Sequence, residues 1–151
     1  LGQTILENFG LPNLGSFSCF SWIDLALERS AFQGHGEQLQ IKMTGPDQVV
    51  ATLSGGNQQK VVLAKWLERN AEILLFDEPT RGIDVGAKYE IYQLMNRLAT
   101  QGKAIVMISS ELPEVLGMSD RVVVMHEGMV KGEITEVAEA SQQDIMKLAV
   151  G

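Results

Sequence analysis

The sequence predicts an α/β fold in which parallel strands are joined by a helix, preceded by a mostly helical part. Two continuous apolar runs, residues 73–76 and 104–108, have the length and composition of parallel strands covered on both faces. Between them, apolar residues recur along 85–99 at the helical period, at Ile91, Leu94, Met95 and Leu98. The order strand, helix, strand predicts a right-handed crossover unit.

The first fifty residues predict helices separated by turns. Residues 3–9 favour a short helix, and the segment that follows, rich in glycine and serine, is typical of a loop. Ser21 is expected to cap a helix over 22–32. Its apolar residues, Trp22, Leu25, Ala26 and Leu27, favour a core helix over a contact with a membrane partner. Residues 33–36 are expected to end this helix, with His35 as a loop histidine, and residues 45–47 to form a turn.

The remaining elements follow from equally local signals. Residues 57–69 predict a helix that ends at Asn70, with Leu63, Trp66 and Leu67 on its apolar face. A glycine at 102 predicts the end of the 85–99 helix. Residues 112–117 predict a short helix, 121–125 and 129–134 two strands joined by a turn at 127–128, and 142–150 a closing helix. His126, beside that turn, is expected to be structural.

Ser54, Gly55 and Gly56 stand where a helix is expected to begin. Backbone N–H groups are unpaired at such a start, and the helix dipole adds partial positive charge. Glycines let the backbone approach a ligand closely, and the serine adds a hydroxyl that can also cap the helix. The turn therefore suits an anionic oxygen such as a γ-phosphate, although a simple capped turn would have the same sequence.

Two acidic residues, Asp77 and Glu78, directly follow the apolar run at 73–76. Open α/β sheets bind their ligands at the carboxyl ends of the strands. Two adjacent buried acids without a cation would be costly, so Mg²⁺ is an expected partner. A solvated turn remains the alternative if the pair is taken alone.

Composition and charge exclude several classes. The formal net charge of −7 argues against a nucleic-acid surface. No apolar run approaches the roughly 18 residues of a membrane span, and no signal peptide is visible. One cysteine, Cys19, rules out an internal disulfide and fits a reducing compartment. The 151 residues allow one domain with a real core.

Three motifs in a fixed order resemble those of an ABC transporter ATPase subunit. LSGGNQQK resembles its signature, ILLFDEPT its Walker B strand and RGID its D-loop. The Gln58-Gln59 variant of the signature and the stretch from Ser109, SSELPEVLGMSDRVVVMHEG, resemble the branch that imports monosaccharides of the ribose, galactose and xylose type. The resemblance implies a partial P-loop NTPase (RecA-like) parallel sheet with helices, plus an α-helical signature subdomain. Residues 1–70 would be that helical subdomain and 71–151 the core, within the second of two tandem nucleotide-binding domains.

The resemblance also implies roles for particular residues, with ATP and Mg²⁺ as cofactors. Asp77 would reach Mg²⁺ through water, and Glu78 would orient or deprotonate the attacking water. Asp84 of the D-loop would join the catalytic set, as would Ser110, which stands where the family usually has a histidine. A serine cannot act as an imidazole at neutral pH, so this domain's own pocket is expected to be impaired. The residues expected to contact nucleotide held by the partner domain are Ser54, Gly55, Gly56 and Gln58.

Partners and location follow from the same resemblance. The chain would pair with the first nucleotide-binding domain of its subunit and act with membrane permease subunits. A periplasmic sugar-binding protein would be an indirect partner, and nucleic acid none. The subunit would be peripheral, on the cytoplasmic face of the bacterial inner membrane.

The phosphate-cradling loop G-x-x-x-x-G-K-[ST] is not found in the sequence. The family places it upstream of Leu1, so the chain is expected to be part of a longer protein and to hydrolyse no ATP alone. A second interpretation is a non-catalytic dimerisation or interaction module in which the acids and glycines are relics. DNA-repair and chromosome-structuring relatives of these motifs carry long heptad coiled coils, which this sequence lacks.

Overall fold

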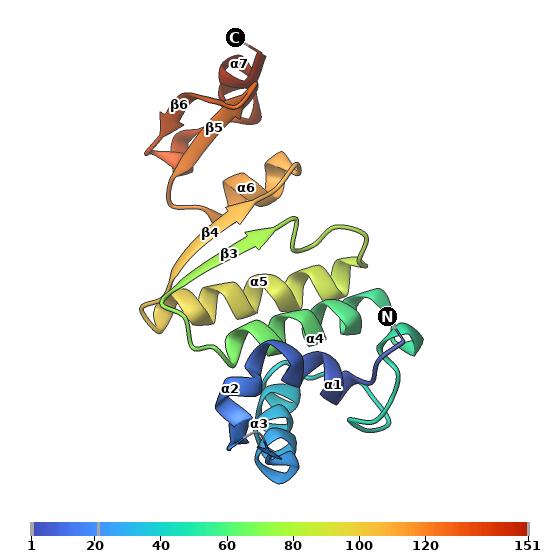
Figure 1. Ribbon diagram of the computed structural model, residues 1–151. Helices are drawn as coiled ribbons and strands as arrows, with labels where there is room; N and C mark the ends of the chain where they lie inside the picture. Colours follow the sequence, from blue (N-terminus) through green and yellow to red (C-terminus); the bar gives the residue numbers. More distant parts are fainter. Residues whose placement is uncertain (1, 21, 151) are drawn as a thin grey trace. The chain divides into compact units, whose positions relative to one another are not determined.

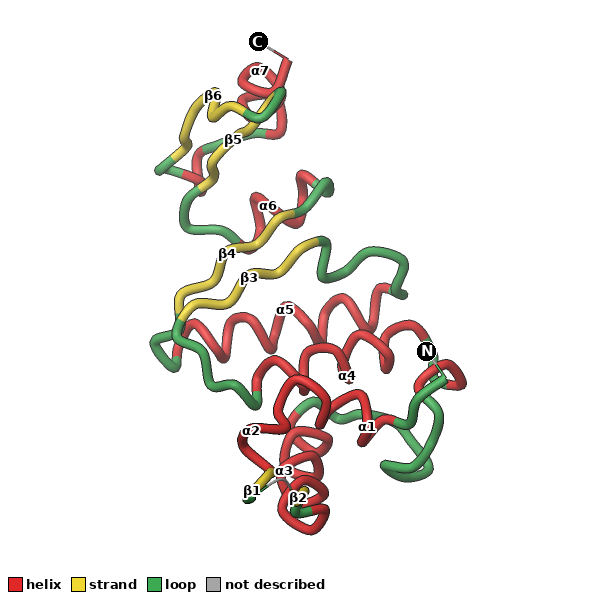
Figure 2. Tube along the Cα trace, viewed as in Figure 1, coloured by secondary structure: helices red, strands yellow, loops and turns green. Residues whose placement is uncertain are grey.

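This computed structural model (Figures 1 and 2) describes residues 2–20 and 22–150. The chain divides into two compact units. One unit combines Leu1–Glu72 with Thr80–Lys103, and the other combines Ile73–Pro79 with Ala104–Gly151. Across the described residues, no helix has the length and apolarity that a membrane crossing requires.

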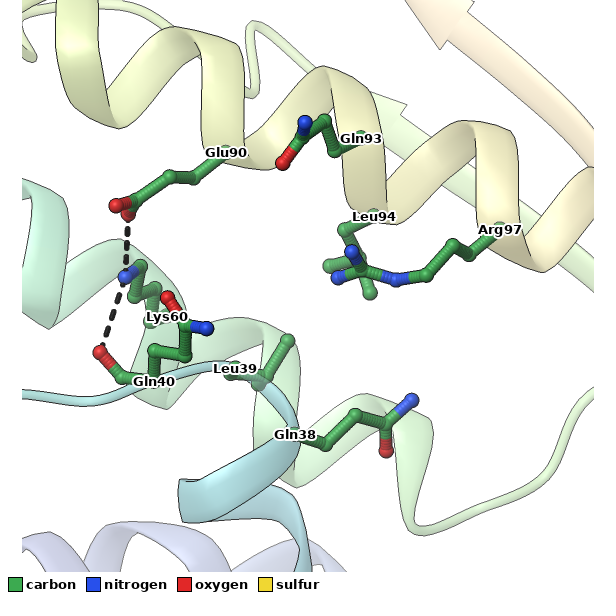
Figure 3. Close-up of a pocket in the computed structure, with 8 residues that line it drawn as sticks. All are labelled: Gln38, Leu39, Gln40, Lys60, Glu90, Gln93, Leu94 and Arg97. Carbon is green, nitrogen blue, oxygen red and sulfur yellow. Dashed lines mark hydrogen bonds and ion pairs between the residues drawn. The ribbon is translucent and has the colours of Figure 1, made fainter.

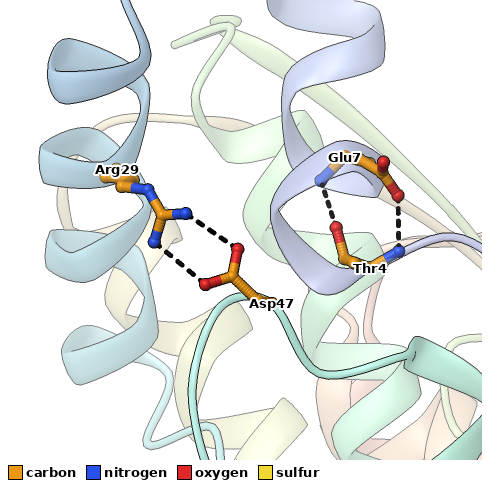
Figure 4. A network of polar contacts seen from close by, with 4 residues as sticks. All are labelled: Thr4, Glu7, Arg29 and Asp47. Atoms are coloured by element: carbon orange, nitrogen blue, oxygen red, sulfur yellow. Dashed lines mark hydrogen bonds and ion pairs between the residues drawn. The ribbon is translucent and has the colours of Figure 1, made fainter.

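The first unit is mainly helical. Its elements are α1 (Ile5–Gly10), the 3₁₀ turn η1 (Leu11–Asn13), α2 (Leu14–Phe17), β1 (Ser18–Cys19), β2 (Trp22–Ile23), α3 (Leu25–Gln38), η2 (Val50–Thr52), α4 (Gly55–Leu67) and α5 (Val85–Thr100). Thr4 and Glu7 form a reciprocal capping box at the start of α1, and Arg29 of α3 forms a two-bond ion pair with Asp47 (Figure 4). The short helix predicted over 3–9 is thus confirmed as α1.

Helix α3 differs from its predicted bounds at both ends. Trp22 belongs to a short strand paired with Ser18–Cys19, and the helix starts at Leu25. Asp24 caps it, because its Oδ1 accepts hydrogen bonds from the N–H groups of Ala26 and Leu27, both at 3.0 Å. The proposed cap at Ser21 lies outside the described residues. The expected break at 33–36 is wrong, since the helix runs on to Gln38 and His35 is helical.

The prediction that the apolar residues of the segment 22–32 form the core is also wrong. Trp22, Leu25 and Leu27 are 82%, 61% and 50% exposed. The buried face of α3 is instead made of Glu28, Phe32 and Gly36. The reason lies far away in sequence: the ring of Phe9, from α1, lies 5.8 Å from Phe17, 5.3 Å from Phe32 and 5.7 Å from His35, centroid to centroid.

Helix α5 matches its predicted stripe, with Ile91, Leu94, Met95 and Leu98 buried. Gly102, at a φ of +86°, ends it in the expected left-handed conformation. Helix α4 is rotated relative to expectation: Leu63 is buried, but Trp66 is 51% exposed. Its buried residues are Gly56, Lys60, Val61, Leu63 and Ala64.

The second unit contains two small sheets. Strands β3 (Ile73–Asp77) and β4 (Ala104–Ile108) pair in parallel, with Ile73 opposite Ala104 and Asp77 opposite Ile108. This confirms the two strands and their parallel pairing. Their predicted burial on both faces is wrong within the described residues, because burial alternates along β3. One face stays exposed, with Ile73, Leu75, Val106 and Ile108 between 48% and 71% accessible.

The other elements of this unit are α6 (Leu112–Met118), β5 (Val122–His126), β6 (Met129–Ile134), η3 (Val137–Glu139) and α7 (Gln142–Val150). Strands β5 and β6 are antiparallel, as predicted, around a turn at Glu127 and Gly128 with φ values of 49° and 74°. Positive φ at both positions is the conformation that a two-residue hairpin with a type I′ turn requires. The core of this hairpin and α7 consists of Val122, Val124, Val137 and Ile145.

Candidate functional site

The signature turn, residues 54–56, forms the start of α4. Ser54 has the extended N-cap conformation, with φ −62° and ψ 154°, but its side chain makes no capping bond. Its Oγ instead accepts a hydrogen bond of 2.9 Å from Nδ2 of Asn57. Because Ser54 and Gly55 are exposed, the first-turn backbone amides of α4 have no serine cap and lie beside solvent. Such a helix start can bind an anionic oxygen.

Two amide side chains hold the signature turn in place. Asn57 Oδ1 accepts a hydrogen bond of 2.8 Å from the N–H of Lys42, which ties the turn to the segment before it. Gln58 Nε2 donates to the carbonyl oxygen of Leu53 at 2.9 Å. The role of Gln58 as a nucleotide contact stays a prediction. Asn57 was missed from sequence, where only its place in the first helical turn could have suggested it.

Asp84, the acid of the D-loop, caps α5. Its Oδ1 accepts a hydrogen bond of 3.0 Å from the N–H of Ala87. The D-loop and the start of α5 contact the signature turn: a Cβ added at Gly55 would lie 3.7 Å from the carbonyl oxygen of Gly82. A Cβ added at Gly56 would lie only 2.7 Å from that of Ala87. The first unit therefore brings Ser54, Gly55, Gly56 and Asp84 onto two neighbouring helix starts.

Asp77 and Glu78 end strand β3 in the second unit. Asp77 is exposed, and Glu78 takes a φ of 47°, which is uncommon for a residue with a side chain. The N–H of Glu78 donates to the carbonyl oxygen of Ile108 at 2.9 Å. The Oε1 of Glu78 accepts a hydrogen bond of 3.0 Å from the backbone N–H of Ser110. The second unit thus brings Glu78 and Ser110 together at the carboxyl ends of its two parallel strands.

The loop that carries Ser110 is held by a buried acid. Ser109 Oγ donates to the carboxylate of Glu114, which is 5% exposed, and accepts from the N–H of Glu111 at 3.0 Å. These bonds fix the backbone on both sides of Ser110. Neither Ser109 nor Glu114 was predicted to be part of the site, since their roles depend on which groups the fold brings near them.

The exposed carboxylate of Asp77 is the kind of ligand that a Mg²⁺ ion shared with phosphate would use. In the described part of the chain, no three side chains of His, Cys, Asp or Glu cluster closely enough to hold a metal. Mg²⁺ commonly uses only one or two carboxylates and completes its shell with water and phosphate oxygens. A single exposed carboxylate at a strand end matches a Mg²⁺ site of this kind, in which water and phosphate oxygens supply the remaining ligands.

A small polar pocket lies where the end of α3 meets α4 and α5 (Figure 3). Lys60, whose side chain is 7% exposed, forms an ion pair with Glu90 and donates to the carbonyl oxygen of Gln40 at 3.1 Å. The pocket has a volume of about 60 Å³. This is far below the ~300 Å³ at which small-molecule sites usually begin, so we interpret it as part of the helix packing.

Curated proteins similar to this chain are sugar import ATP-binding proteins. The ribose import ATP-binding protein RbsA of Bacillus licheniformis is 55% identical over 151 residues, covering 100% of this chain and 30% of that protein. A putative ribose/galactose/methyl galactoside import ATP-binding protein of Rhizobium etli is 56% identical, covering 100% of this chain and 29% of that protein. The chain therefore spans about 30% of the length of these relatives.

Solved structures with the same fold are ATP-binding cassettes. A dimeric cassette in a post-hydrolysis state, bound to ADP and Pi, superposes with a TM-score of 0.74 at 25% identity, covering 89% of this chain and 57% of that one. A nucleotide-free cassette gives a TM-score of 0.77 at 25% identity, covering 99% and 64%. The profile of the ABC transporter family matches residues 3–81. The chain, whose fold and motifs were expected to be those of an ABC cassette, belongs to the ABC transporter family.

Proposed function

We propose that this chain is part of an ATP-hydrolysing subunit that powers import of a monosaccharide, and that it supplies the signature, Walker B strand and D-loop. The support is identity of 55% or more, over the whole chain, to ribose and ribose/galactose import ATP-binding proteins. Because those relatives are about three times as long, the activity belongs to a complete subunit of that length.

The signature turn acts on nucleotide held by another cassette. Two cassettes pair head to tail, and Ser54, Gly55 and Gly56 contact the γ-phosphate on the partner cassette. Their contribution is electrostatic, because the backbone amides are already fixed in place before the reaction. The contact with the γ-phosphate forms only when the two cassettes close. The observation that carries this proposal is the exposed start of α4, where the serine side chain leaves the amides uncapped.

The residues at the ends of β3 and β4 form part of this chain's own nucleotide pocket. Asp77 would hold Mg²⁺, and the ion would supply positive charge to the phosphate oxygens when bound. Glu78 orients the attacking water, while Asp84 fixes the D-loop at the interface through its cap on α5. Ser110 cannot carry a proton as an imidazole does, so this pocket hydrolyses ATP more slowly than the pocket of the partner cassette.

We place the complete subunit at the cytoplasmic face of the inner membrane as a peripheral protein. It pairs there with the first nucleotide-binding domain of the same subunit and with membrane permease subunits. A periplasmic sugar-binding protein delivers the sugar to the permease without touching this chain.

The test is ATP turnover of the complete subunit carrying Ser54→Arg. An arginine at the exposed helix start would fill the place of the γ-phosphate, so turnover should fall at least tenfold. Ser30→Arg, on the exposed side of α3, is the matched control and should leave turnover within twofold. Equal turnover in the two variants would exclude the proposed role of the signature turn.

The alternative, a non-catalytic interaction module, is distinguished from the proposed function by the turnover of the Ser54→Arg variant together with a nucleotide-binding measurement. This chain alone should show no saturable thermal shift with Mg-ATP, because the phosphate-cradling loop is not in its sequence. If the complete subunit binds Mg-ATP and hydrolyses it at the same rate with serine or arginine at position 54, the result would favour the non-catalytic module.

A further inference from the structure

The side-chain positions that the two glycines of the signature turn leave empty lie against the D-loop at Gly55 and against the first turn of α5 at Gly56. Gly56 is buried, and the Cβ that it lacks would lie 2.7 Å from the Cβ of Ala87. The Cβ that Gly55 lacks would lie 3.7 Å from the carbonyl oxygen of Gly82 and 3.8 Å from Cγ2 of Ile83. The chain therefore uses glycine at 56 for a reason internal to the cassette.

A second contact one helical turn further along fixes the same two helices. Lys60, four residues after Gly56 on α4, pairs with Glu90, three residues after Ala87 on α5, at 2.5 Å between Nζ and Oε2. The side chain of Lys60 is 7% exposed, so this pair is largely withdrawn from solvent. Two contacts spaced by one helical turn therefore join α4 to α5.

The carboxylate of Asp84 fixes the other side of this arrangement. Its Oδ1 accepts a hydrogen bond of 3.0 Å from the N–H of Ala87 and so holds the first turn of α5 against the D-loop. The hydrogen bond from Ala87 to Asp84 thus fixes the position of the Ala87 methyl group. That methyl group in turn limits where Gly56 can lie.

We infer that Ala87 is a positioning residue for the signature turn: the size of its side chain sets where the amides of residues 54–56 lie. This inference rests on the proposed function, in which those amides contact the γ-phosphate. Carbon atoms in contact lie about 3.5–4.0 Å apart, so a methyl group at residue 56 has to move the turn by about 1 Å. A displacement of that size in a catalytic arrangement can reduce a rate about 100-fold.

The deciding experiment is a double-mutant cycle in the complete subunit. Gly56→Ala should lower kcat for ATP at least tenfold while changing KM less than twofold, because ATP is held by the other cassette. Adding Ala87→Gly removes the methyl group that the new side chain meets, so the double variant should regain at least threefold in kcat. Ala99→Gly, on the exposed side of α5, controls for the loss of helix propensity and should give no recovery.

Thermal unfolding of the complete subunit, measured on the same variants, separates position from stability. A double variant that recovers melting temperature but not kcat would overturn the inference, because residue 56 would then need to be glycine for nucleotide approach. The Ser54→Arg variant serves as the reference for the proposed function. If that variant turns over normally, the proposed function fails and this inference with it, whereas a slow Ser54→Arg without recovery in the cycle overturns the inference alone.

Discussion

The carboxylate of Glu78 is bound by the backbone of Ser110 and not by its side chain: the N–H of residue 110 donates to Oε1 at 3.0 Å. A backbone donor is present whatever residue other than proline occupies position 110. The arrangement around Glu78 is therefore compatible with a histidine at 110 as well as with the serine. What the serine changes is the chemistry available beside Glu78, since a hydroxyl does not exchange protons near neutral pH as an imidazole does.

Ser110→His should therefore raise the ATP turnover of the complete subunit, because it adds an imidazole beside an acid whose position is kept by the backbone. We expect a gain of about twofold or more at saturating ATP, and no gain with Ser110→Ala. Steady-state turnover of the two variants measures this. A histidine variant no faster than the alanine variant would show that Ser110 is not what limits this pocket.

Glu78→Gln should reduce turnover less than the equivalent change in the partner cassette. The glutamine keeps a side-chain oxygen that can accept the N–H of Ser110, so the substitution removes the charge and leaves the local structure in place. If the pocket on this chain contributes little hydrolysis, the loss should be under threefold, against at least tenfold in the partner cassette. Equal losses would indicate two pockets of equal activity.

Much of the fold was predictable because its signals are local. The stripe of α5, its stop at Gly102 and the hairpin at Glu127 and Gly128 each depend on a few neighbouring residues. Helix α3 was not predictable in this way, since its buried face is selected by Phe9, a residue far from it in sequence. The apolar residues at its start suggested a core that the structure places elsewhere.

The residues of the candidate site likewise fall into those predictable from local motifs and those that depend on the folded chain. The motifs identified which residues lie at the start of α4 and at the ends of β3 and β4. They could not identify Asn57 or Ser109, whose side chains bind backbone groups or acids that only the folded chain brings near. Nor could they show that Gly56 faces Ala87, because a glycine in sequence does not indicate the direction in which a side chain is excluded.

Gly10→Ala should destabilise the first unit. A Cβ at residue 10 would lie 1.6 Å from Oε1 of Glu28, which is itself 6% exposed and cannot move freely. Overpacking of this kind typically costs ~1–3 kcal/mol, so the melting temperature of the chain should fall by several degrees. Gly15→Ala is a matched control, since nothing lies within 4 Å of the Cβ it would add. Equal melting temperatures for the two variants would contradict the contact.

The stability of the chain should also depend on pH through Glu28. Burial raises the pKa of Glu28 above its ordinary value of 4.5, against the opposing effect of Arg29. The protonated form is then favoured in the folded state. Its contribution is fully present below pH 4.5 and is lost as the pH rises through the raised pKa.

Glu28→Gln should remove that dependence, because an amide stays neutral throughout. Melting temperatures of the variant and the natural chain, measured from pH 4.5 to 7.5, should diverge as the pH rises, with the variant the more stable at the upper end. Glu37→Gln, an exposed acid of the same helix, should run parallel to the natural chain. Parallel curves for Glu28→Gln would mean that burial does not shift this carboxyl.

Asp144 should contribute to stability with the opposite pH dependence to Glu28. Its Oδ2 accepts hydrogen bonds from Oγ and N–H of Ser141, at 2.6 and 3.0 Å, and Lys147 donates to its Oδ1 at 3.1 Å. The side-chain bond from Ser141, then the backbone bond and Lys147, lower the pKa of Asp144 from 3.8 to about 2. The stabilisation is therefore present above pH 3.8 and is lost as the pH falls through about 2. Asp144→Asn should weaken the start of α7 at neutral pH, measured as faster amide hydrogen exchange over residues 142–150. At pH 2 the difference between variant and natural chain should shrink, and a difference that stayed constant with pH would show that the charge of Asp144 is not what holds α7.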